Sequence, residues 1–124
     1  MEELIRIDIL AHADFSARLR HTKRTPGYAA FATLVSNIRA ENPENTLLLD
    51  AGDEFSDERW GGESMVRAIE LSGTDAMTLG NHEFDHGQAF LEECIKSASF
   101  PVLCANIHEK ATGLPVRGTI PYVI

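Results

Sequence analysis

The chain has 124 residues, of which 44% are apolar and 24% charged. This composition is typical of one folded globular domain and excludes a disordered, collagen-like or coiled-coil chain. Eleven Lys and Arg against nineteen Asp and Glu give a net charge of −8. This charge disfavours a general nucleic-acid binder, because most of the surface would repel phosphates.

Neither a membrane span nor an export signal is expected from the sequence as written. No apolar run reaches the ~18 residues that a membrane helix needs. The first residues, Met1-Glu2-Glu3, are acidic where a signal peptide would be basic. As written, the chain is by default expected in the cytoplasm.

Four segments have the residue pattern of β-strands. Residues 4–10 alternate between apolar and polar side chains, as in a strand with one solvent-exposed face. Residues 46–49, 76–79 and 102–104 are unbroken apolar runs, typical of strands that are covered on both faces. A final short strand is predicted at residues 122–124.

Three amphipathic patterns lie between these strands. Apolar residues recur at helical spacing in residues 28–40, again around residues 65–69, and again around residues 90–95. Strands that alternate with helices predict an α/β fold with a mostly parallel sheet, built through right-handed crossovers. Ligands of such sheets bind where the strands end.

Polar side chains follow three of the predicted strands. Asp14 comes after the first strand, Asp53 after the second, and Asn81, His82 and Asp85 after the third. Because the carboxyl ends of parallel strands meet at one edge, we expect these residues to converge there. Carboxylate, amide and imidazole groups are ligands of divalent metal ions, so a metal site is one interpretation.

The individual motifs differ in specificity. Asp14 alone is also typical of a turn or a helix cap, and Gly52-Asp53 of a common turn. Gly52 and Gly80 are expected to let the backbone turn sharply directly after a strand. Asn81-His82 has no evident packing role, so it is the strongest signal. A solvated loop is the simplest interpretation of three other acids, namely Glu54, Asp57 and Glu58.

Two other kinds of site are disfavoured. Cys94 and Cys104 lack the spacing of a zinc motif or a redox pair, and both are expected to be buried and inert. No Gly-x-Gly-x-x-Gly follows the first strand, which disfavours a dinucleotide-binding domain.

Taken together, these motifs resemble the calcineurin-like metallophosphoesterases, specifically the bacterial 5′-nucleotidase and 2′,3′-cyclic-nucleotide phosphodiesterase branch. The similarity spans nearly the whole chain and is most specific in residues 75–85 and moderately specific in residues 47–53. It implies that residues 1–124 are the N-terminal segment of a catalytic domain that is incomplete at its C-terminus. The fold would be the N-terminal half of a four-layer αββα sandwich.

The resemblance also implies a role for each site residue. Asp14 corresponds to the first metal-binding aspartate, Asp53 to the carboxylate that bridges two ions, and Asn81 to a ligand of the second ion. His82 corresponds to the histidine that contacts the phosphoryl group, and Asp85 to the acid that orients it. Two divalent ions, Mn, Zn or Fe, would activate water to hydrolyse a phosphomonoester, most often a nucleotide.

One departure from the family pattern supports an alternative function. Ser16 stands where the family has a metal-binding histidine, and further family ligands lie downstream of this segment. His12 is not expected to replace the missing ligand, because neighbouring strand residues point to opposite faces. His21 lies in a loop and is the other candidate. The alternative is a degenerate, non-catalytic relative that binds a ligand or a partner.

The incomplete sandwich carries two further expectations. The sheet face that a second sheet would cover should expose apolar side chains and favour self-association. Without the downstream ligands, the chain alone should be inactive or weakly active. Members of this branch are often periplasmic or attached to the cell surface.

Overall fold

The computed structural model describes residues 4–56 and 62–123. In this part of the chain, strands and helices alternate as predicted. The strands are β1 (Asp8–His12), β2 (Thr46–Asp50), β3 (Ala76–Thr78) and β4 (Val102–Leu103). They form one parallel sheet in the order β1-β2-β3-β4. The predicted α/β fold with a parallel sheet is therefore confirmed.

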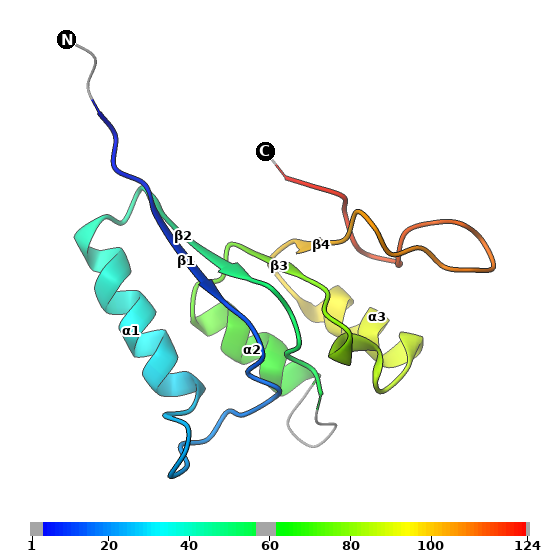
Figure 1. Ribbon diagram of the computed structural model, residues 1–124, viewed down its shortest axis with the longest axis horizontal. Helices are drawn as coiled ribbons and strands as arrows, with labels where there is room; N and C mark the ends of the chain where they lie inside the picture. The colour runs from blue at the N-terminus through cyan, green and yellow to red at the C-terminus, as the bar shows by residue number, and fades with distance from the viewer. Residues whose placement is uncertain (1–3, 57–61, 124) are drawn as a thin grey trace.

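Three helices cover one face of the sheet (Figure 1). They are α1 (Tyr28–Glu41), α2 (Glu63–Leu71) and α3 (Gln88–Ser97), and a short 3-10 helix, η1 (His82–Phe84), precedes α3. The apolar stripes of these helices pack against the sheet and form the core. This packing is favourable because it removes apolar surface of the helices and of the sheet from water. The fully buried apolar side chains there include Leu48, Met65, Ile69, Met77 and Leu91.

The opposite face of the sheet is apolar and exposed. In β2 the burial alternates, so that Leu48 faces the helices while Leu47 and Leu49 face away from them. Ile9 of β1, which pairs with Leu47, is 63% exposed, and Leu47 is 42% exposed. The predicted uncovered apolar face is therefore present in the described part of the chain.

Both ends of the predicted strand set differ from the structure. The first strand begins at Asp8 rather than residue 4, because its partner β2 begins at Thr46, directly opposite Asp8. The strand predicted at residues 122–124 is wrong for Tyr122 and Val123, and residue 124 lies outside the described residues. Pairing with β4 occurs instead at Ile120, and it cannot continue because Pro121 has no N–H to donate.

Arg39 links helix α1 to the strand starts. Its guanidinium donates to the carbonyl oxygens of Thr46 and Gly73, and to the carboxylate of Asp75. Asp75 in turn accepts the amide of Leu48 at 2.8 Å. These contacts fix the register between β2 and β3 at one end of the sheet, and thereby the positions of the loops at the other end.

Candidate functional site

The loops after β1 and β2 run side by side. The amide of Asp14 donates to the Gly52 carbonyl at 3.0 Å, and the amide of Ser16 donates to the Asp53 carbonyl at 3.0 Å. Asp14 and Asp53 both have a φ of 64°, in the left-handed region that few residues other than glycine adopt. The strand pairing thus continues beyond the strand ends and holds the two loops with the predicted metal-binding aspartates together.

Asp53 also contacts the loop after β3. Its Oδ1 accepts the backbone N–H of His82 at 2.8 Å. A Cβ on Gly80 would overlap that same Oδ1, so Gly80 is needed for close approach. The expected sharp turn is seen at Gly52, with a φ of 92°, but Gly80 does not have a positive φ. Asn81 lies between Gly80 and His82, at the start of η1.

His82 and Asp85 form a close pair on the exposed side of η1. His82 Nδ1 lies 2.6 Å from Asp85 Oδ2, and both side chains are about half exposed. The hydrogen bond and the charge of Asp85 raise the pKa of His82. The imidazole therefore keeps its proton to higher pH, which suits it for contact with an anionic group.

Glu83 is a site residue that the sequence reasoning missed. Its side chain is fully buried. Its carboxylate accepts backbone N–H groups from both the β2 and β3 loops, at 2.6–3.2 Å: those of Asp53, Glu54, Phe55 and Gly80. The sequence contained one indication of this role. Two sharp turns leave backbone N–H groups without partners in the sheet, and a nearby carboxylate can accept their hydrogen bonds. Glu83 locks Asp53 and the start of η1 into one rigid unit.

A second group of polar side chains is buried between the sheet and α1. His12 and Asp50 lie opposite each other in β1 and β2, and Glu54 follows in the next loop. His12 Nδ1 lies 3.5 Å from Glu54 Oε1, and His12 Nε2 lies 3.8 Å from Asp50 Oδ2. The interpretation of Glu54 as a solvated residue is therefore wrong. Asp57 and Glu58 lie outside the described residues.

Burial changes the acidity of all three groups. Desolvation, with the nearby charge of Glu54, raises the pKa of Asp50 to about 7. Desolvation, with the nearby charge of Glu83, raises the pKa of Glu54 to about 8. Desolvation lowers the pKa of His12. The low-dielectric surroundings thus disfavour the charged form of every member.

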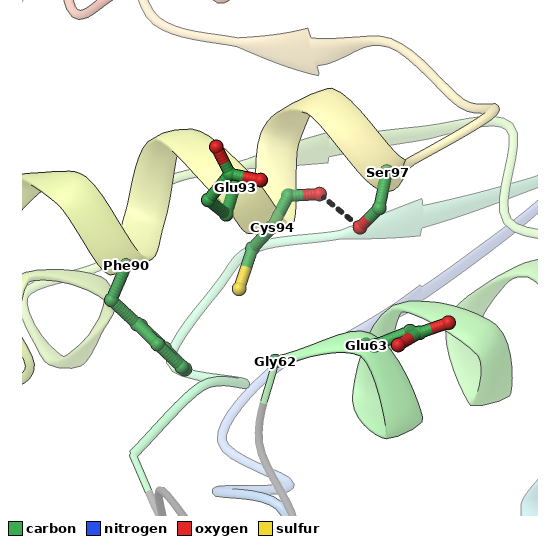
Figure 2. A pocket seen from close by; sticks show the side chains of 6 residues that line it. All are labelled: Gly62, Glu63, Phe90, Glu93, Cys94 and Ser97. Atoms are coloured by element: carbon green, nitrogen blue, oxygen red, sulfur yellow. Dashed lines mark hydrogen bonds between the residues drawn. The ribbon is translucent and has the colours of Figure 1, made fainter.

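The cysteines lie elsewhere. Both thiols are buried and free, as predicted. Cys94 lines a cavity of about 210 Å³ between α3 and the start of α2, with Phe90 and Gly62 beside it (Figure 2). Desolvation raises the pKa of the Cys94 thiol to about 11. The thiol is therefore neutral at physiological pH and unsuited to nucleophilic chemistry.

Comparison with known proteins identifies the family. The family model described as calcineurin-like phosphoesterase matches residues 9–121. The chain belongs to this family. It is 39% identical over 121 residues to a snake venom 5′-nucleotidase of Gloydius brevicauda, and 44% identical over 105 residues to a 5′-nucleotidase of Rattus norvegicus. These matches cover 86% and 79% of this chain.

A solved structure has a similar fold. The NAD nucleotidase of Haemophilus influenzae matches with a TM-score of 0.75 and 27% identity, over 86% of this chain and 22% of that one. The chain spans about a fifth of the length of the two curated relatives, 20% and 18%. The predicted family and fold class are confirmed. No helix in residues 4–56 and 62–123 has the length and hydrophobicity to cross a bilayer.

The donor set at the loop edge fits a divalent cation. Asp14 and Asp53 offer carboxylate oxygens and Asn81 an amide oxygen, which are hard donors that suit such ions. Their loops are joined by the hydrogen bonds described above. Ser16, beside Asp14, supplies no imidazole, and its hydroxyl donates to the Asp14 carbonyl at 3.4 Å. The assignment of these three residues as metal ligands stays a prediction.

Proposed function

We propose that this chain provides the metal-binding and phosphate-contacting part of a site that hydrolyses nucleotide phosphate esters. The observation that carries the proposal is the central position of Asp53. Its carbonyl accepts the amide of Ser16, and its carboxylate accepts the amide of His82. One residue thereby couples all three loops that bear the candidate ligands. The 5′-nucleotidase and NAD nucleotidase relatives support a nucleotide as the substrate.

Each residue would have a distinct task. Asp14, Asp53 and Asn81 would hold divalent ions, which supply an activated water and neutralise phosphate charge when bound. Asp85 occupies Nδ1 of His82, so Nε2 is the nitrogen left to donate to a phosphoryl oxygen. A protonated His82 would stabilise the negative charge that grows on that oxygen in the transition state. Glu83 would keep Asp53 and His82 in register.

We further propose that residues 1–124 are a segment of a larger catalytic domain. Two observations support this proposal. The chain spans about a fifth of its curated relatives, and the sheet face formed by Ile9, Leu47 and Leu49 is apolar and exposed. The family's four-layer sandwich would cover that face and add further metal ligands. The chain alone should therefore turn over substrate slowly or not at all.

The test is hydrolysis of AMP and p-nitrophenyl phosphate with added Mn²⁺, in this chain and in a longer protein that contains it. We expect activity in the longer protein. In the longer protein, Asp53→Asn and His82→Ala should each lower kcat/KM by ~10²-fold or more, because each removes a group that acts on the transition state. The exposed His108 is the matched control, and His108→Gln should change nothing. Inertness of both proteins would contradict the proposal.

Ser16 favours the second candidate, a non-catalytic relative that binds a ligand or partner. Calorimetric titration with Mn²⁺ separates the two functions. If the loop site is intact, Ser16→His should raise Mn²⁺ affinity by ~10-fold or more, because it adds an imidazole ligand beside Asp14. The backbone at Ser16, with a φ of 50°, lies in a region where histidine is enriched. If neither protein binds Mn²⁺, the non-catalytic function is favoured.

A further inference from the structure

The buried group of His12, Asp50 and Glu54, named here the inner cluster, has polar atoms without partners. Only 7% of the His12 side chain is exposed, and neither carboxylate side chain is exposed at all. Both ring nitrogens of His12, Asp50 Oδ2 and Glu54 Oε2 are buried without a hydrogen bond. Buried polar atoms nearly always have a partner. Four such atoms in three adjoining side chains indicate a missing ligand.

The apolar surroundings of the inner cluster make its ionised carboxylates energetically unfavourable unless a cation is bound. The His12 ring packs against aromatic rings, with centroid distances of 4.5 Å to Phe31 and 5.5 Å to Phe15. In the described part of the chain, the ion pairs of Asp50 and Glu54 are both with His12. Two ionised carboxylates in such an apolar setting are strongly unfavourable unless positive charge is added. One divalent cation would neutralise both.

We propose that His12, Asp50 and Glu54 bind one divalent transition-metal ion, such as Zn²⁺, Mn²⁺ or Fe²⁺. One imidazole nitrogen and two carboxylate oxygens form a donor set typical of these metals. A candidate ligand atom of each residue lies within 4.8 Å of the other two. Ligands about 2.0–2.2 Å from a tetrahedral ion are roughly 3.3–3.6 Å apart. His12 Nδ1 and Glu54 Oε1 are 3.5 Å apart and already have this separation. Asp50 lies nearest the other ring nitrogen, Nε2, so binding of one ion by all three residues requires the Asp50 carboxylate to move toward Nδ1 and Glu54.

This inner site differs from the loop site in position and in consequence. His12 and Asp50 are paired strand residues on the helix-covered face, whereas Asp14, Asp53 and Asn81 belong to loops beyond the strand ends. A cation in the inner cluster would bind both strand ends to Glu54, the residue after Asp53. It would thereby stabilise the strand ends that carry the proposed catalytic loops. The inner site goes beyond the proposed function and does not depend on it.

Metal titration of this chain tests the proposal, in a background that lacks the loop site. An Asp14→Asn/Asn81→Ala protein should still bind one equivalent of Zn²⁺ by calorimetry, and Co²⁺ should give visible ligand-field bands. Adding Glu54→Gln should weaken Zn²⁺ binding ~100-fold or more, because loss of a direct ligand exceeds the 10–100-fold effects of outer groups. Adding His108→Gln, the matched control, should leave it unchanged.

Glu54→Gln is nearly isosteric and removes a buried ionisable group, so the metal-free protein should be at least as stable as its parent. If it nevertheless fails to fold, ¹⁵N spectra of the His12 imidazole in the parent protein decide. Zn²⁺ should shift one ring nitrogen to a coordinated value. Absence of Zn²⁺ binding in the Asp14→Asn/Asn81→Ala protein, binding that Glu54→Gln does not weaken, or an unshifted His12 would each overturn the inner site. If metal binds the inner cluster but not the loop site in the parent protein, the result contradicts the proposed function and leaves the inner site supported.

Discussion

Glu83 shows how a single side chain can organise this edge of the sheet. Four backbone N–H groups, from the separate loops after β2 and β3, donate to one carboxylate. The sequence indicated its neighbours Asn81, His82 and Asp85 as candidate site residues. It could not predict Glu83, because its role depends on amides whose direction only the folded loops determine. The burial of Glu54 was missed for the same reason.

Glu83→Gln should destabilise the chain by about 2–6 kcal/mol. The amide has one acceptor oxygen, and its NH₂ group would face N–H donors, so at least two buried donors lose their partner at ~1–3 kcal/mol each. Urea denaturation measures the change. Glu93→Gln is the matched control, because the Glu93 side chain is exposed and its Lys96 contact is 3.9 Å, a pair worth ~1 kcal/mol at most. Equal stability losses in the two variants would refute the role of Glu83.

At the scale of elements, apolar periodicity predicted the helices well. The structure places α1 at Tyr28–Glu41 and α3 at Gln88–Ser97, close to the predicted residues 28–40 and the stripe at 90–95. Strand ends were predicted less well, because a strand extends only as far as its neighbour pairs with it. Residues 4–7 have strand-like alternation but no partner in β2. The sequence of residues 4–7 alone therefore does not indicate that the strand begins only at Asp8.

The exposed sheet face should bind hydrophobic dye and favour self-association of this chain. Ile9→Thr and Leu47→Thr together should reduce dye fluorescence and the weight-average mass in sedimentation. Stability should change little, because threonine suits strands and both side chains are already partly exposed. Leu71→Thr, which alters an exposed leucine of α2, is the control and should have no such effect. A monomer that binds no dye before any substitution would contradict this prediction.

The buried carboxyls of Asp50 and Glu54 should make the metal-free chain less stable as the pH rises. Both carboxyls have folded pKa values, about 7 and about 8, above those of the unfolded chain, ~4. The folded state therefore binds more protons, and its stability is fully present below about pH 4 and declines as the pH rises toward 8. In EDTA, the melting temperature should fall by several degrees between pH 5 and pH 8.

The double variant Asp50→Asn/Glu54→Gln isolates this contribution. His12 acts in the opposite direction, since desolvation lowers its pKa and the folded state therefore binds fewer protons there than the unfolded chain. The variant should therefore lose the decline at high pH while keeping the remaining pH dependence. If the melting temperatures of wild type and variant change with pH in the same way from pH 5 to pH 8, the inner cluster does not titrate in this range.

At the scale of the whole molecule, a parallel sheet explains why distant sequence motifs form one candidate site. Strand order follows chain order, so the loops after β1, β2 and β3 lie next to each other. The sequence predicted this convergence because alternating strands and helices leave few other topologies. The inner cluster was beyond such reasoning. His12 was set aside as a ligand on the grounds of strand alternation, yet alternation places it with Asp50 on the buried face.

Diffraction from crystals of this chain grown with Mn²⁺ and inorganic phosphate would test the central claim most directly. The anomalous signal of manganese locates the ion without reference to activity. We predict a peak at coordinating distance, ~2.2 Å, from Asp53 and from at least one of Asp14 and Asn81, with phosphate near His82. A well-ordered structure in which these side chains diverge, and no peak lies beside Asp53, would contradict the account.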